Sequence, residues 1–303
     1  MALEGRLRGE SCLPFTLDRK RSYRADVVVT LLGMPIFSRQ GVGSAFASVR
    51  EAFIDGRKIV SLQFGGGANP ERTHGIQYFG STEEVIQLNP GGMVEAGCFG
   101  FVTARHNNQE GLEQARQRLV ANGSSASPPV IAVEERVEAG RLKNASATLA
   151  TDDFALQDWQ ELPRQVRSAF QRLDVARKDV NFPAGSSTFL YAVLIAIRGA
   201  GKSSLDCMHN AKPFRLDFEK APDGRFGGVS RLTGQIHDLT RGHTSTFRLW
   251  LGEGSDLPIR IEFSPRPYLR IALEMDPALD LSNRREDVCR EASFTFSGAN
   301  ARQ

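Results

Sequence analysis

The chain has 303 residues, of which 41% are hydrophobic and 24% charged, and 38 basic against 35 acidic side chains give a formal net charge of +3. This is the composition of a soluble globular protein, and the near-balanced charge gives no case for nucleic acid or an anionic membrane as a partner. No apolar run reaches the ~20 residues of a membrane-spanning helix.

Two further features bound the class of protein. The four cysteines lie far apart without a CxxC pair, which excludes a zinc ribbon or a redox motif, and we expect neither a metal nor a cofactor. Charged residues stand at positions 4, 6, 8 and 10, where a secretory signal needs an apolar run. The sequence as given therefore predicts a cytoplasmic protein; a truncated N-terminus would make a periplasmic or envelope-associated protein the alternative.

The first hundred residues alternate apolar and polar side chains, which predicts β-strands. Residues 36–53 are either one long strand or two with a bend at 41–43. The glycine run at 65–67 is typical of a turn or bulge, with anion binding by its backbone N–H groups as the rarer alternative. We expect the other strands of this part at 23–31, 60–64, 76–79, 84–88 and 98–103.

A helix is predicted at 109–121, followed by a linker at 124–129. Two strands at 130–137 and 141–150 come next, then a helix that begins near Pro163, a favourable first helical position. After residue 212 a meander is expected, with strands at 213–219, 226–236, 244–251, 257–263 and 268–275 separated by Gly- and Pro-containing turns.

The stretch FLYAVLIAIRGAGKSSL, residues 189–205, resembles a nucleotide-binding phosphate loop, Gly-x4-Gly-Lys-Ser/Thr. Position 196 is alanine where that loop requires its first glycine, and too few residues follow Ser204 for the helix that must come next. We therefore reject a phosphate loop at 196–203. The alternative is a buried helix at 188–198, capped by Ser186 or Ser187 and ended by Gly199–Gly201.

The last three strands have one apolar and one polar face. Arginines and aromatic residues on the polar face make it a candidate ligand-binding surface, although cross-strand pairs on a solvated face fit equally. The candidate ligand-binding residues are Arg248, Trp250, Arg260, Tyr268 and Arg270.

Candidate catalytic residues are few. His237 with His243 matches no metal-ligand spacing, and Cys207 with His209 lacks a third group to form a catalytic dyad. A barrel-type hydratase, cyclase or isomerase would need an inward-pointing acid–base group, for which His237, Glu262 and Glu274 are the candidates.

The C-terminal half carries SSTFLYAVLIAIR, a short hairpin at 210–216, and a meander closing in FRLWLGEGSDLPIRIEFSPRPYLRIALE. With the opening RSYRADVVVTLLGMPIFSRQGVGSA, this resembles a bacterial family of unknown function made of β-rich, often exported proteins, over about half the chain. The resemblance implies a fold and supplies no catalytic residues.

The predicted fold is α+β: a mainly antiparallel β-meander forming a curved sandwich or partly closed barrel, with two or three helices packed on it. We expect one domain over residues 1–280, in halves 1–105 and 129–280 joined by a helical or linker segment at 106–128, and a tail at 281–303. The expected function is non-catalytic binding of an apolar or amphipathic small molecule on or inside a curved sheet, with the barrel-type enzyme as the alternative.

Overall fold

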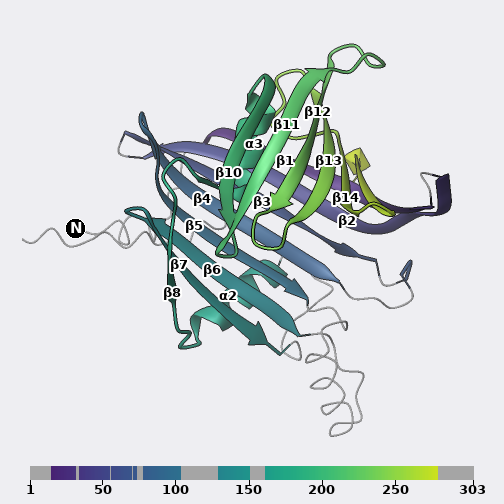
Figure 1. Cartoon of the computed structure of the whole chain (residues 1–303). Helices are drawn as coiled ribbons and strands as arrows, with labels where there is room; N and C mark the ends of the chain where they lie inside the picture. The colour runs from purple at the N-terminus through teal and green to yellow at the C-terminus, as the bar shows by residue number, and fades with distance from the viewer. Residues whose placement is uncertain are drawn as a thin grey trace, which may run out of the picture.

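A computed structural model of the chain describes residues 15–31, 34–54, 56–69, 71–73, 78–103, 129–150 and 161–278. All fifteen strands of this part belong to one sheet, in the order β8-β7-β6-β5-β4-β3-β2-β1-β15-β14-β13-β12-β11-β10-β9 (Figure 1). The strands of the first half are β1 (Phe15–Leu31), β2 (Met34–Ile54), β3 (Arg57–Ala68), β4 (Phe79–Asn89), β5 (Gly92–Thr103), β6 (Val130–Glu138), β7 (Arg141–Leu149) and β8 (Lys178–Asn181).

The remaining elements follow in the second half. Its strands are β9 (Ser187–Thr188), β10 (Gly201–His209), β11 (Lys212–Pro222), β12 (Val229–Asp238), β13 (His243–Gly252), β14 (Arg260–Arg266) and β15 (Leu269–Met275). The two described helices are α2 (Leu162–Gln171) and α3 (Phe189–Arg198).

The sheet is antiparallel except for the short β9–β10 pair, and its first and last described strands pair with each other. β1 and β15 are antiparallel neighbours, with Tyr23 opposite Met275 and Val29 opposite Leu269. The two edges of the sheet are instead β8 and β9, which are consecutive in the chain. The first and last described strands of the chain therefore lie side by side in the middle of the sheet, and the two edges of the sheet are formed by strands from the middle of the chain.

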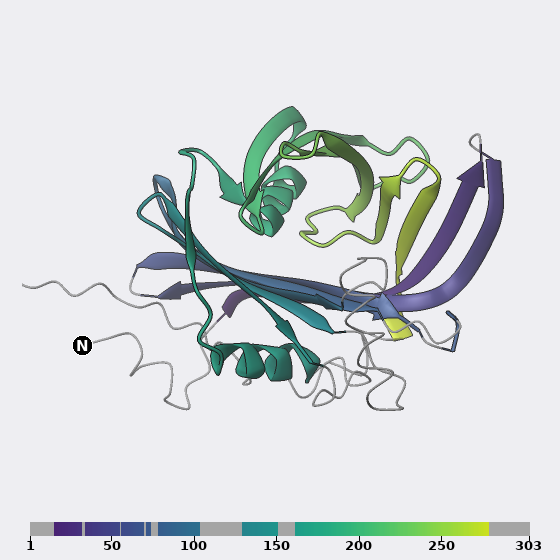
Figure 2. The same ribbon diagram turned by 60° about the horizontal axis from the view of Figure 1, so that its bottom comes forward.

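Two wings extend from the β1–β15 ladder. Figure 2 shows β2–β8 as a broad layer and β10–β15 curling back over it, with α3 between the two and α2 on the opposite side of the layer. We call the surface of the β2–β8 layer that faces α3 the inner face, and the surface that carries α2 the outer face.

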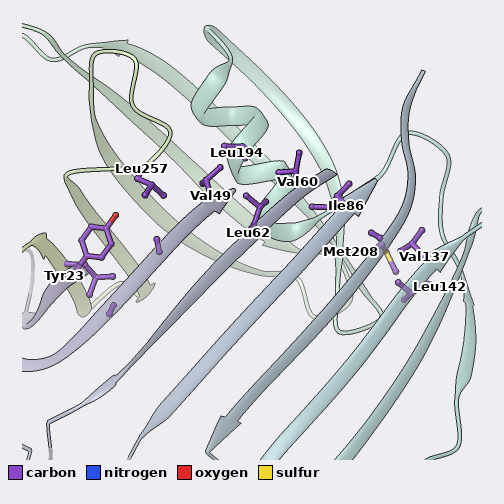
Figure 3. Packing of buried hydrophobic residues seen from close by; sticks show 14 of the residues in the cluster. Tyr23, Val49, Val60, Leu62, Ile86, Val137, Leu142, Leu194, Met208 and Leu257 are labelled. Atoms are coloured by element: carbon purple, nitrogen blue, oxygen red, sulfur yellow. The ribbon is translucent and has the colours of Figure 1, made fainter. Parts of the chain in front are cut away.

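The first core lies between the inner face and the curled wing. It contains Val49, Val60, Leu62 and Ile86 from the layer, with Leu194 of α3 packed among them (Figure 3). The other side of α3 packs on β10–β13. A helix that is apolar nearly all round fits between two sheet surfaces, because neither side of it meets water.

A second core lies on the outer face beneath α2. Leu162, Val166 and Phe170 form the apolar stripe of this helix at helical spacing and are buried. They pack on the outer-face side chains of β4–β7: Phe79, Phe99, Phe101, Val130, Ala132, Ala145 and Leu149.

The predicted fold is confirmed: the protein is mostly antiparallel sheet, open and curved, with helices packed on it. Residues 36–53 form one strand, β2, rather than two. The predicted helix at 109–121, the whole segment 106–128 and the tail at 281–303 lie outside the described residues, and the division into one domain with two halves stays a prediction.

Two local predictions are wrong. The glycines at 65–67 lie inside β3 and pair in continuous register on both sides, with β2 and with β4, so they form neither a turn nor a bulge. The N-cap of α3 is Thr188 rather than Ser186 or Ser187, and its side chain makes no capping hydrogen bond to the helix.

The rejection of the phosphate loop agrees with the structure. α3 ends at Arg198, and Gly201-Lys202-Ser203 begins β10, where a phosphate loop would open a helix. No helix of the described part is long and apolar enough to cross a bilayer.

Candidate functional site

The inner face is ordered in rows, because each strand places every second side chain on it and the ladders hold those positions in register. One row runs Val49, Leu62, Glu84, Cys98, Glu135 and Asn144 across β2–β7. We call it the carboxylate row. It marks where the curled wing reaches the inner face.

Glu84 joins the carboxylate row to α3. Its carboxylate accepts hydrogen bonds from the backbone N–H groups of Leu190 (2.9 Å) and Tyr191 (3.0 Å) and from the Thr188 hydroxyl (2.6 Å). The first N–H groups of a helix have no partner within it, and a negative charge is favourable there. Glu84 thus caps α3 from another strand, in place of the missing capping bond of Thr188.

Glu135 joins the same row to the turn between β10 and β11. This two-residue turn has Asn210 and Ala211 with φ of 54° each, as in the tight turns that favour asparagine and glycine. The Glu135 carboxylate accepts the N–H groups of Asn210 (2.9 Å) and Ala211 (2.5 Å), and also the side-chain amide of Asn144 (3.2 Å). No described strand ladder joins the turn to β6, so this carboxylate makes the connection.

Burial sets the ionisation of this region. Glu84 is fully buried, and this burial, together with the nearby Glu135 charge, raises its pKa to about 7 although its three hydrogen bonds act to lower it. Burial also raises the pKa of the Cys98 thiol, which lies between the two glutamates, well above its usual range. A neutral thiol there avoids a third buried charge.

Beyond the carboxylate row, the inner face continues as a surface that α3 does not cover. In Figure 1 the strands β4–β7 run on beyond the curled wing. Two rows of this region consist of small or apolar residues that are partly exposed. We call these residues the open floor: Phe64, Gly66, Gly80, Thr82, Gly100, Val102, Ile131 and Val133. Phe64 is 37% exposed and the others are half-buried.

The open floor is supported from behind. Val130 and Ala132, which alternate with Ile131 and Val133 along β6, are fully buried beneath α2. Arg167 of α2 lies over the Phe99 ring and forms an ion pair with Glu83 (2.5 Å), which fixes the helix against the sheet. The floor is therefore a sheet surface held by a packed core on one side only.

Glycines flatten the floor. Gly66 and Gly80 face each other across β3 and β4, and Gly100 follows in the next row on β5. A Cβ at Gly80 would lie 3.3 Å from the Phe101 carbonyl, and one at Gly100 would lie 3.1 Å from Thr82 Oγ1. The neighbouring atoms are thus close enough at these points to favour glycine.

The predicted ligand-binding residues lie elsewhere. Arg248, Arg260 and Arg270 surround the buried Glu262 carboxylate at 3.6, 2.6 and 3.9 Å. Trp250 lies beneath the Arg260 guanidinium and donates to Asp223 (2.9 Å), while Tyr268 is exposed in the β14–β15 turn. The structure brings four of the five together in cross-strand pairs on the polar surface of β13–β15.

The predicted catalytic residues lie on this same polar surface. Glu262 and Glu274 are engaged by arginines, and His237 on the neighbouring strand β12 lies 2.9 Å (Nε2) from a carboxylate oxygen of Asp217 and 3.1 Å (Nδ1) from the Thr244 hydroxyl. Their strand neighbours Ile236, Ile261 and Leu273 contribute to the apolar cores instead. None of the three candidates points toward an apolar interior, as the enzyme hypothesis required.

The Cys207–His209 pair is equally unsuited to catalysis. Burial raises the pKa of Cys207 to about 12, which keeps the thiol protonated. The His209 ring lies against Phe189 and Phe214 (5.6 and 6.4 Å between ring centroids), and burial lowers its pKa. Among the described residues no group of three His, Cys, Asp or Glu side chains forms a metal site.

Comparisons with known proteins add one likeness. No family model matches the chain, and no curated protein matches it. A solved structure that it resembles is the crystal structure of a β-barrel-like protein of the domain of unknown function DUF1849 from Brucella abortus. The match has 7% sequence identity and a TM-score of 0.42, and covers 85% of this chain and 95% of that one.

Proposed function

We propose that the protein is a non-catalytic binding protein that holds an apolar or amphipathic small molecule on the open floor. The observation that carries this proposal is the contrast between the two sides of one strand: Val130 is fully buried beneath α2, whereas its neighbours Ile131 and Val133 are left partly exposed on the inner face. Contiguous exposed apolar surface on a soluble protein commonly marks a binding site.

The shape of the floor supports a small, flat or linear ligand. Gly66, Gly80 and Gly100 have no Cβ, so a ligand on this face could approach their backbone closely, and Phe64 and Val102 lie beside them with apolar side chains. The hydroxyls of Thr82, Ser146 and Thr148 lie in the same two rows and offer hydrogen bonds to a polar end. Apolar walls with a few polar groups are the usual lining of small-molecule sites.

The first test is native mass spectrometry of the purified protein, with 1-anilinonaphthalene-8-sulfonate fluorescence as the second readout. We expect a co-purified small molecule or saturable binding of the dye. The double variant Phe64→Ser/Val133→Thr removes apolar surface from the floor and should weaken dye binding by about tenfold.

Phe226→Ser is the matched control, since Phe226 is 60% exposed but lies in the turn between β11 and β12. It should bind the dye as the unaltered protein does. Absence of both ligand and dye binding would contradict the proposal, and equal dye binding by the floor variant and the control would place the site elsewhere.

A further inference from the structure

The curled wing ends in a strand whose outer edge is largely unpaired. β10 is the last long strand of this wing (Figure 1); it pairs with β11 along its whole length and with β9 only at Cys207 and Met208. No described strand pairs with residues 202–206 on the outer side. The backbone N–H and C=O groups of such an edge form a template for another strand. We call residues 202–206 the free edge.

The free edge is open to solvent. Lys202, Ser203, Ser204 and Asp206 are exposed, and Leu205 among them is half-buried. None of the five residues is proline, so each keeps the N–H group that a strand ladder uses. The free edge is therefore suited to accept a second strand.

Both ends of the free edge are set by the chain itself. At one end, Ser187 of β9 takes the position beside Cys207. At the other, Gly201 has a φ of 68°, which turns the chain out of the line of the strand. A second copy of β10 that lies antiparallel on the free edge uses its full length only with Ser204 opposite Ser204. A shift of two residues either brings one copy against β9 of the other or shortens the pairing.

The same register matches charges. With Ser204 opposite its copy, Lys202 of one chain lies opposite Asp206 of the other, twice by symmetry. Within one chain, Asp206 forms an ion pair with Arg215 (2.8 Å), and Lys202 lies opposite Glu219. Each of these rows therefore alternates in sign across the two joined sheets: Glu219, Lys202, Asp206, Arg215. Opposite charges directly across a ladder stabilise it, and like charges destabilise it.

We propose that the free edge is a dimerisation surface, through which two copies of the chain join their sheets by antiparallel pairing of residues 202–206 about a twofold axis at Ser204. The register that uses the whole free edge is also the register that pairs its charges. An unrelated strand would require no such self-complementarity, so a second copy is the partner that fits. The pairing involves neither the open floor nor a ligand on it.

Sedimentation velocity at rising protein concentration tests for the dimer. We expect a reversible dimer at concentrations on the order of 100 µM, because a short strand pair buries little surface. Lys202→Glu and Asp206→Lys each place like charges opposite one another twice and should weaken the dimer by about tenfold or more. Lys143→Glu, the same change at an exposed lysine of β7, should dimerise as the unaltered protein does.

Mixing the two charge variants separates dimerisation from stability. In a mixed dimer the new glutamate lies opposite the new lysine, and the native Asp206 lies opposite the native Lys202. Both pairs again have opposite signs, so the mixture should associate about as tightly as the unaltered protein, whereas each variant alone should not. Mixing would not rescue a variant that had simply lost its fold.

A disulfide locates the twofold axis. Directly opposite residues of antiparallel strands have Cα atoms about 4.5–5.5 Å apart, which a disulfide spans. Oxidised Ser204→Cys should therefore link two copies through position 204, identified by mass spectrometry of the peptides, whereas Thr246→Cys at an exposed position of β13 should not. The proposal is overturned by a protein that stays monomeric over the whole concentration range, by a dimer that neither charge reversal weakens, or by charge variants that do not associate when mixed.

Discussion

Glu84 and Glu135 lie on either side of Cys98 in one row, and together they attach the curled wing to the inner face at two points. Each carboxylate accepts two backbone N–H groups from the other wing, Glu84 at the start of α3 and Glu135 at the β10–β11 turn. In a closed barrel, a ladder of backbone hydrogen bonds would join the two sheet surfaces. Here the hydrogen bonds of two buried carboxylates hold the curled wing on the inner face.

The buried Glu84 predicts a pH dependence of stability. Its pKa rises from 4.5 to about 7 on folding, so between these values the folded state binds more protons than the unfolded state. Stability from this group is therefore complete below pH 4.5 and is lost as the pH rises toward 7, by at most about 3 kcal/mol. Urea unfolding at several pH values measures this loss.

Glu84→Gln isolates the effect, since the difference between variant and unaltered protein cancels the other titrating groups. His209 acts in the opposite direction: its lowered pKa costs stability as the pH falls below 6.5. As the pH rises from 4.5 to 7, Glu84→Gln should lose less of its free energy of unfolding than the unaltered protein does. An unchanged profile would refute the assignment, and Glu219→Gln on β11 is the exposed control.

Removing Glu135 should detach the turn. Glu135→Ala leaves the N–H groups of Asn210 and Ala211 and the Asn144 amide without their shared acceptor, which should cost about 2–4 kcal/mol. Hydrogen exchange at Asn210 and Ala211 should accelerate more than exchange in β13. Glu134→Ala, the next residue on the other side of β6, is the control for loss of a carboxylate from this strand.

Substitutions on the two sides of β6 should differ in their effect on stability. Val130→Ala removes a fully buried side chain beneath α2 and should cost about 2–3 kcal/mol, whereas Val133→Ala on the half-buried inner side of the same strand should cost under about 1 kcal/mol. Thermal or urea unfolding compares the two. Equal losses would mean that the floor is as well packed as the outer face.

The two described cysteines should be inert in the folded protein. Both are buried with raised pKa values, so neither provides a thiolate at neutral pH. Cys98 and Cys207 should react with Ellman's reagent at the rate of unfolding, and mass spectrometry of the labelled peptides can tell them from the other thiols. Fast labelling of Cys207 in the native state would reopen the case for a reactive Cys207–His209 pair.

The sequence patterns predicted local structure well where the environment follows from alternation. Phe247, Phe263 and Ile271 lie opposite one another in the structure, as do Leu249, Ile261 and Leu273, so the apolar face expected for the last three strands is confirmed. The apolar helix at 188–198 and the strands that flank Glu138-Ala139-Gly140 were predictable for the same reason.

The candidate site was not predictable in this way, because it depends on contacts between distant segments. Glu84 looks like any polar residue in a strand until the curled wing brings the start of α3 to it. The glycines of β3 suggested a turn, although a curved sheet also uses glycine where strands approach closely. Only the register shows that Gly66, Gly80 and Gly100 share one face.

The pairing of β1 with β15 has a consequence for biosynthesis. The edge of β1 stays without its partner until nearly all the described chain has left the ribosome, since Tyr23 must await Met275. Unpaired strand edges promote aggregation, and charged side chains are a common defence. β1 carries Asp18, Arg19, Lys20, Arg21, Arg24 and Asp26 along its length, a density of charge suited to keeping a nascent edge soluble while it waits.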